Sequence, residues 1–76
     1  MNKTRRIQLE EIARKLESLQ GDLYIVMNEE EECYDNMPES IQGGAKGETA
    51  RAVIDLLGEA GCSFDELVDS IRAAAE

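Results

Sequence analysis

Apolar residues recur along the chain in alternating steps of three and four, in two long runs. The first run is apolar at every position except Glu30: Leu9, Ile12, Leu16, Leu19, Leu23, Val26, Glu30, Cys33 and Met37. The second run is apolar throughout: Ala50, Val53, Leu57, Ala60, Phe64, Leu67, Ile71 and Ala74. This spacing is typical of helices packed along a coiled-coil-like seam. It predicts an all-α fold with one helix over about residues 3–36 and another over about residues 48–75.

The segment between the two runs predicts a connection over about residues 37–47. Pro38 disfavours helical geometry at Met37, so the first helix is expected to end near Asn36. Gly43, Gly44 and Gly47 indicate a loop, in which residues 38–42 can form one helical turn. Two helices of about 30 residues, each roughly 45 Å long, can pair across so short a connection only if they are antiparallel. We therefore predict an antiparallel two-helix hairpin that forms a single domain, residues 1–76.

The second helix has a weak point between Gly58 and Ser63. A glycine inside a helix costs about 1 kcal/mol relative to alanine, and both Gly58 and Gly61 fall here. Ser63 followed by Glu66 is also a capping-box pattern, from which a third helix could begin. The three–four spacing nevertheless continues unbroken from Ala50 to Ala74. That continuity favours one helix with a weak or kinked point, and a break remains the alternative.

Charges are divided unevenly along the chain, whose formal net charge is −9. Residues 1–15 carry five bases and two acids, whereas residues 16–76 carry three bases and fifteen acids. We predict that Arg51 lies near the acids of residues 29–32. We also predict exposed ion pairs, worth about 0.2–1 kcal/mol each, between the two chain ends. The bases would be Lys3, Arg5, Arg6, Arg14 and Lys15, and the acids Asp65, Glu66, Asp69 and Glu76.

The apolar stripe of the second helix is wider than one seam requires. Ile54, Gly61, Val68 and Ala75 each follow directly after a seam position, and Met27 and Tyr34 do the same in the first helix. A wide stripe suits a helix with two neighbours. We therefore predict a two-fold dimer of hairpins, which forms a four-helix bundle. The core and the oligomer seam are expected at Leu9, Ile12, Leu16, Leu19, Leu23, Val26, Val53, Ile54, Leu57, Phe64, Leu67, Val68 and Ile71.

Few residues in the chain could carry catalysis or hold a metal. There are two cysteines and no histidine, which argues against a structural zinc site and a Ser–His nucleophile. Cys33 falls on the seam and is expected to be a small buried hydrophobe, while Cys62 falls on the solvent side. The hairpin would separate the two by about 16 Å along its axis, too far for a disulfide. We expect a protein that is not an enzyme and has no cofactor and no metal.

Acidic residues concentrate where the first helix ends. Most often such a run is a solvated helix end, but it could also bind a basic partner protein. Oxygen ligands for a metal are not expected to converge there, because successive helical residues diverge by about 100°. The negative field repels phosphate backbones, so no direct nucleic-acid binding is expected. The candidate acidic surface consists of Glu29, Glu31, Glu32, Asp35 and Glu39.

The glycine-rich segment Gly43–Thr49 superficially resembles a phosphate-binding loop. Such a loop needs a strand before it and Ser or Thr directly after Gly-Lys, whereas Lys46 is followed by glycine. The segment is better explained as a turn, with capture of an anion by free helix N–H groups as the weaker alternative. No apolar run reaches 18 residues, so we expect no membrane span and a cytoplasmic location.

One distinctive segment, Tyr34-Asp35-Asn36-Met37-Pro38-Glu39, follows a Glu-rich helix and a basic start, Met-Asn-Lys-Thr-Arg-Arg. This layout resembles small uncharacterised helical proteins encoded by phages and prophages of Gram-positive, Clostridia-like bacteria. The sequence departs from that group at Gly21, Gly58 and Gly61, where ordinary helix formers are expected. The resemblance implies a phage origin and a helical fold, and it brings no site residues.

Three functional hypotheses follow from the sequence. The first is a non-catalytic, acidic, phage-derived protein that binds and occludes a host or phage protein, such as a component of a defence system, in a bacterial or infected host cell. The second is a structural or assembly module that uses its helical bundle for oligomerisation. The third and weakest is capture of a small anionic ligand, such as a nucleotide, near the glycines. The expected partners are a second copy of the chain and an unidentified protein.

Overall fold

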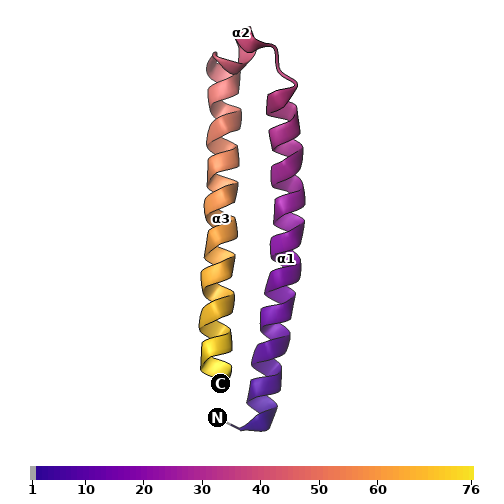
Figure 1. Cartoon of the computed structure of the whole chain (residues 1–76), viewed down its shortest axis with the longest axis vertical. Coiled ribbons are helices and arrows are strands. Elements are labelled where there is room, and N and C mark those ends of the chain that lie inside the picture. Colours follow the sequence, from indigo (N-terminus) through magenta and orange to yellow (C-terminus); the bar gives the residue numbers. More distant parts are fainter. Residues whose placement is uncertain (1) are drawn as a thin grey trace.

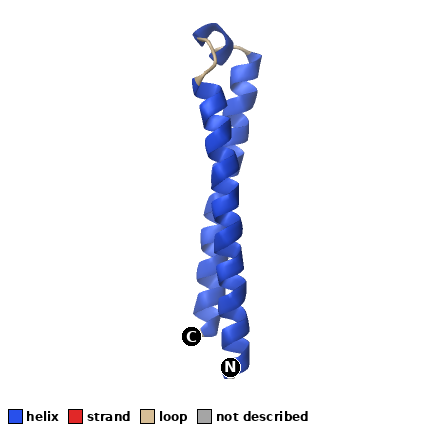
Figure 2. Ribbon diagram, turned by 90° about the vertical axis from the view of Figure 1, so that its right-hand side faces the viewer, coloured by secondary structure: helices blue, strands red, loops and turns tan. Residues whose placement is uncertain are grey.

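The computed structural model describes residues 2–76 as an antiparallel helical hairpin. It consists of α1 (Lys3–Asp35), the single turn α2 (Glu39–Gln42) and α3 (Ala45–Ala75). The helices α1 and α3 lie side by side along their length, and α2 sits in the bend between them (Figures 1 and 2). The hairpin measures 59 × 15 × 11 Å. The prediction of an all-α fold built from two long paired helices is thus confirmed.

The ends of α1 are fixed by local hydrogen bonds. The Asn2 side chain accepts a hydrogen bond from the Arg5 backbone N–H at 2.8 Å, which satisfies one of the free donors of the first turn. At the other end the Asn36 N–H donates to the Glu32 carbonyl oxygen at 3.0 Å. Pro38 is the N-cap of α2, and its carbonyl oxygen accepts from the Ile41 and Gln42 N–H groups at 2.9 and 3.0 Å. The turn expected within residues 38–42 is therefore present.

The third helix begins at Ala45, three residues before the expected start at residue 48. Gly44 is its N-cap in an extended conformation, and the Gly44 carbonyl oxygen accepts from the Glu48 N–H at 3.0 Å. Gly47 therefore lies in the first helical turn, where it is buried. A Cβ atom at this position would overlap the backbone of Gln42. This glycine is therefore needed for close packing against the bend. Its interpretation as a loop residue was wrong, because it lies inside α3.

The weak point between Gly58 and Ser63 does not break α3, which runs unbroken from Ala45 to Ala75 (Figure 1). The Ser63 hydroxyl donates to the Glu59 carbonyl oxygen, one turn earlier, at 3.1 Å. Ser63 is therefore an internal helical residue and not the cap of a third helix. The alternative of a separate helix from Ser63 is wrong, and the unbroken apolar spacing was the better guide.

The packed seam lies one residue further round each long helix than expected. In α3 the buried residues Gly47, Ile54, Gly61 and Val68 follow at steps of seven, and α1 buries Ala13. The shared central positions are half-buried, as the sequence pattern predicts: Leu9, Leu16, Leu23, Leu57, Phe64 and Ile71. The remaining predicted seam positions are among the exposed large apolar residues: Ile12, Leu19, Val26, Val53 and Leu67.

Small residues account for this rotation of the seam. Ala13 and Gly61 face the opposite helix, and neither carries a side chain that would hold the helices apart. If the seam ran through Ile12 and Ala60 instead, the larger Ile12 side chain would face the opposite helix. The contact of Tyr24 over Gly61 would also be lost. Spacing alone does not distinguish the two seams, because both continue the three–four pattern. The size of the residues that meet decides between them.

Candidate functional site

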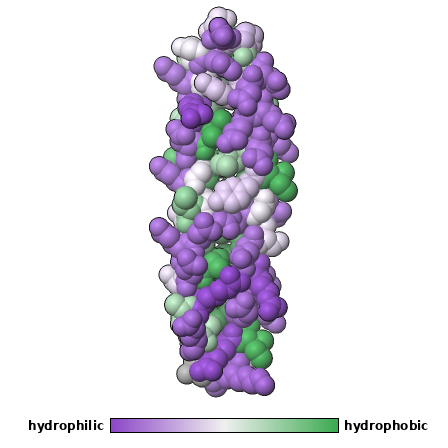
Figure 3. Space-filling view, in the orientation of Figure 1, coloured by the Kyte–Doolittle hydropathy of each residue, from purple (hydrophilic) through white to green (hydrophobic). Residues whose placement is uncertain are grey.

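The rotated seam gives the hairpin two unlike sides. Because α1 and α3 are antiparallel, residues with the same offset from the seam fall on the same side of the hairpin. Glu10, Glu17 and Arg72 lie on one of these sides, which carries the ion pairs between the helices. The opposite side, here called the apolar side, carries Ile12, Leu19, Val26, Val53, Ala60 and Leu67. The face shown in Figure 3 is mostly hydrophilic, with only small hydrophobic patches.

A polar cluster at mid-length joins the two helices. The Gln20 side-chain amide donates to the Gly61 carbonyl oxygen at 2.9 Å and to Asp65 Oδ1 at 2.7 Å. The Tyr24 ring lies over Gly61, where an added Cβ atom would be 2.5 Å from the tyrosine hydroxyl oxygen. Gln20 interrupts an otherwise largely apolar seam. A polar residue in such a position fixes the register of two packed helices at some cost in stability.

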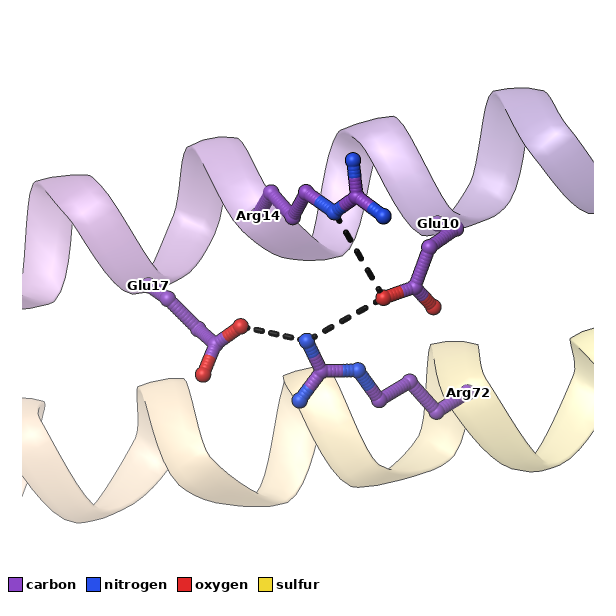
Figure 4. A network of polar contacts seen from close by, with 4 residues as sticks. All are labelled: Glu10, Arg14, Glu17 and Arg72. Carbon is purple, nitrogen blue, oxygen red and sulfur yellow. Dashed lines mark hydrogen bonds and ion pairs between the residues drawn. The ribbon is translucent and has the colours of Figure 1, made fainter.

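A second polar cluster lies near the open end of the hairpin (Figure 4). Arg72 of α3 is hydrogen-bonded to Glu17, and its Nη2 atom lies 3.3 Å from Glu10 Oε1. Glu10 also pairs with Arg14 within α1 at 3.8 Å. The hydrogen bonds to Glu17 and Glu10 raise the pKa of Arg72 above its ordinary value. The guanidinium therefore stays charged and links two turns of α1.

The direction of this pairing differs from the prediction. Lys3, Arg5, Arg6 and Lys15 make no ion pair with any described residue, and Arg14 pairs only within its own helix. The inter-helix pairs instead join a base of α3 to acids of α1. By the register of the Gln20–Asp65 contact, Lys3, Arg5 and Arg6 lie beyond the C-terminal end of α3 (Figure 1). For the remaining bases, a cross-helix contact also requires a position beside the seam. Glu10, Glu17 and Arg72 have such positions.

Arg51 contacts Tyr34, two positions beyond the acids of residues 29–32. Its guanidinium carbon lies 5.9 Å from the centre of the Tyr34 ring, in cation–π geometry. It makes no ion pair with the acids of residues 29–32 within the described chain. Tyr34 is one residue beyond Cys33 on α1 and so lies on the rotated seam. The Gln42 side chain donates to the Tyr34 carbonyl oxygen at 2.8 Å, which ties the bend to the end of α1.

Large apolar side chains on the apolar side are well exposed. Leu19 is 55% exposed, and Leu56, which borders the apolar side on α3, is 63% exposed. Residues spaced by seven along a helix form a column on its surface. On α3 the column that borders this side contains no charged residue and consists of Thr49, Leu56, Ser63 and Ser70. Two open hollows lie here. One is lined by Ala60, Ser63, Phe64 and Leu67, and the other by Glu30, Met37, Ala45, Lys46, Thr49, Ala50 and Val53.

The residues of the candidate acidic surface all lie toward the bend end of the hairpin. Glu29, Glu32, Asp35 and Glu39 are exposed and Glu31 is half-buried. None of the five forms an ion pair with another residue of the described chain. The fourth acid of the run, Glu30, was not assigned to this surface and lines the hollow near Lys46. The bend end therefore presents unpaired negative charge to solvent.

Both cysteines are free and exposed. The expectation that Cys33 is buried was wrong for the single hairpin, because the rotation of the seam turns the column of Ile12 and Leu19 outward, and Cys33 belongs to that column. Residues 2–76 contain no group of three Cys, Asp or Glu side chains placed to hold a metal ion. None of their helices combines the length and apolar character needed to cross a membrane.

Comparison with known proteins identifies no matching protein family, no matching curated protein and no matching solved structure. The phage origin implied by the Tyr34–Glu39 segment stays a prediction. The basis for a functional proposal is therefore the geometry of the hairpin: one polar side whose charges are partly paired, one apolar side and one acidic end. Sequence reasoning identified most residues of the apolar side but did not separate them from the residues buried within the hairpin.

Proposed function

We propose that the protein is a non-enzymatic interaction protein that acts as a homodimer, with its apolar side buried between two hairpins in a four-helix bundle. The observation that carries this proposal is the exposure of large aliphatic side chains, Leu19 and Leu67 among them, along one side. Contiguous exposed apolar surface marks interaction sites. The broad side of the hairpin extends over 59 × 15 Å, which is large enough to accommodate a standard interface of ~800 Å² of buried surface per partner.

The thin core of the single hairpin supports the same proposal. Its only buried hydrophobic side chains among the described residues are Ala13, Ile54 and Val68. Chains of this size usually need a disulfide, a metal or a partner chain to be stable. A second hairpin against the apolar side would bury the large aliphatic side chains there, which are 37–55% exposed in the single hairpin. The gain per residue would be about half of the ~1.5–3 kcal/mol for burying a fully exposed side chain. Dimerisation would thus complete the core.

Sedimentation analysis over a concentration series tests this proposal. We expect a dimer that dissociates on dilution, and we expect Leu19→Lys to sediment as a monomer at concentrations where the wild-type chain is dimeric. Ile25→Lys is the matched control, because Ile25 is equally exposed and lies on the side of α1 away from α3. A wild-type chain that stays monomeric throughout, or an Ile25→Lys effect equal to that of Leu19→Lys, would contradict the proposal.

A second candidate function is occlusion of a basic partner by the acidic surface. It is favoured by the exposure of Glu32 and Asp35 without any ion pair in the described chain. Under this proposal the dimer is a phage-derived inhibitor of a host or phage protein, such as a defence component. Phage plating on strains with defined defence systems, with the chain expressed, tests it. Protection of the phage is expected, and it should be lost in Glu31→Lys/Asp35→Lys while dimerisation persists.

A further inference from the structure

We propose that the two hairpins of the dimer pack with their bends at opposite ends, so that α1 lies against α1 of the second copy and α3 against α3, with the two-fold axis passing close to Ala60. This inference rests on the proposed dimer. A two-fold pair that stacks the apolar sides has two possible arrangements. In one the bends lie together and α1 faces the second copy's α3. In the other the bends are opposed and each helix faces its own counterpart.

Charge favours the opposed arrangement. Residues 29–51, which form the bend end, carry seven acids and two bases. Placing the bends together would bring two such ends into contact, with repulsion between them. Opposing the bends instead brings the acidic end of each α1 beside the first half of the other α1, where Lys3, Arg5, Arg6 and Lys15 form no ion pair in the described hairpin.

The border of the apolar side on α1 fits this pairing in detail. Lys15 and Glu29 lie in one column, two heptads apart, directly beside the column of Leu19 and Val26. When Leu19 of one copy meets Val26 of the other, Lys15 of each copy falls opposite Glu29 of the other. The ion pairs missing within the hairpin are then formed between copies. Asp22, midway in the same column, faces its own counterpart, which is the cost of this arrangement.

The border on α3 is uncharged and fits against itself. Leu56 is the most exposed of the large hydrophobic residues, and a hollow lined by Ala60, Ser63, Phe64 and Leu67 lies further along the same side. A two-fold axis at Ala60 places Leu56 of each copy at the height of Phe64 of the other, over this hollow. With the bends together, Leu56 would instead face Glu29 of the second copy, an apolar side chain against a carboxylate.

The axis positions derived from the two helices lie within one helical turn of each other. The contacts Gln20–Asp65 and Tyr34–Arg51 set which residues of α1 and α3 lie at the same height. By this register the point midway between Leu19 and Val26 lies level with residues 62–63, and the α3 pairing puts the axis at residue 60. The difference is about 4 Å at 1.5 Å per residue. A single two-fold axis midway between these heights shifts the facing residues of each pair by about 4 Å, less than the 5.4 Å of one helical turn.

Disulfide trapping distinguishes the two arrangements. In a Cys33→Ser/Cys62→Ser chain, Ala60→Cys would lie beside its own counterpart across the axis, within the ~7 Å between Cα atoms that a disulfide allows. We expect it to form a covalent dimer on oxidation. Leu67→Cys is the matched control in the same column. The two copies of this cysteine would lie about 21 Å apart along the length of the helices and would not react with each other.

The outcomes separate the orientation from the dimer itself. Suppose that the chain sediments as a dimer, that Ala60→Cys does not cross-link to itself, and that a mixture of Ala60→Cys and Val26→Cys chains does cross-link. The bends then lie together, and this inference is wrong while the proposed dimer stands. A monomeric wild-type chain overturns both. Asp22→Asn gives an independent measurement, since removing the like-charge pair is expected to lower the dimer dissociation constant about twofold. No change, or weaker binding, would contradict the opposed arrangement.

Discussion

The Tyr24 ring covers Gly61 so closely that the space for a Cβ atom on Gly61 is already occupied. An added Cβ would lie 2.5 Å from the tyrosine hydroxyl oxygen and 2.6 Å from ring carbon Cε1. The Gly61 carbonyl oxygen also accepts a hydrogen bond from the Gln20 amide. This contact joins the middle of α1 to the middle of α3. It explains why a glycine stands inside a long helix, where it costs helix stability.

Gly61→Ala is expected to destabilise the hairpin, although alanine is the better helix former. The gain of about 1 kcal/mol in helix propensity is outweighed by overpacking against Tyr24, which costs about 1–3 kcal/mol. We expect a net loss of about 1 kcal/mol in the free energy of unfolding, measured by urea denaturation. In a Tyr24→Ala chain the same substitution should become stabilising. A loss that persists without the tyrosine ring would contradict the proposed cause.

Gly58→Ala is expected to have the opposite effect. An added Cβ at Gly58 would meet no atom within 4 Å, and the same holds for Gly21 in α1. Each substitution should therefore raise the free energy of unfolding by about 1 kcal/mol through helix propensity alone. The two sites share no contact, so their effects should add. Thermal and urea unfolding of the single and double variants measure this, and a destabilised Gly58→Ala chain would show a contact absent from the single hairpin.

Gly47→Ala is expected to be more damaging than Gly61→Ala. The added Cβ would overlap the backbone of Gln42, and a backbone cannot turn aside as a side chain can. We expect α2 and the start of α3 to separate, with a loss of about 2–3 kcal/mol. Gly43→Ala is the control, because its nearest atom would be at 3.6 Å. Hydrogen exchange of the amides in residues 39–50 measures the change, and equal protection in both variants would contradict it.

Arg72→Gln is expected to lower the melting temperature slightly, and less so as salt is added, because the ion pairs with Glu10 and Glu17 are substantially exposed. The raised pKa of Arg72 means that, as the pH rises, this stabilisation begins to fall only above the ordinary arginine value and is lost through the raised one. The arginine itself therefore adds no pH dependence between about pH 7 and 10. Arg14→Gln, which removes one pair within α1, should have a smaller effect.

The sequence by itself determined the helical class, the antiparallel pairing and the position of the bend. Period-three–four apolar spacing, Pro38 and the nearby glycines are local signals, and each acts through backbone geometry that tertiary contacts did not override. The continuity of α3 through Gly61 could be read in the same way. That the candidate acidic residues lie near the bend could also be read from sequence, because they are consecutive or nearly so at the end of one helix; their role as a binding surface stays a prediction.

Only the tertiary structure decided which neighbouring column of each apolar stripe faces inward. Both choices obey the same spacing, so hydrophobicity could not separate Ile12 from Ala13 or Val53 from Ile54. The decision came from size, since Ala13, Gly47 and Gly61 allow close packing that bulkier residues prevent. The same rotation decided which charges could meet, pairing Arg72 with Glu10 and Glu17. It also turned Leu19 and Leu67 outward, onto the side from which a function is proposed.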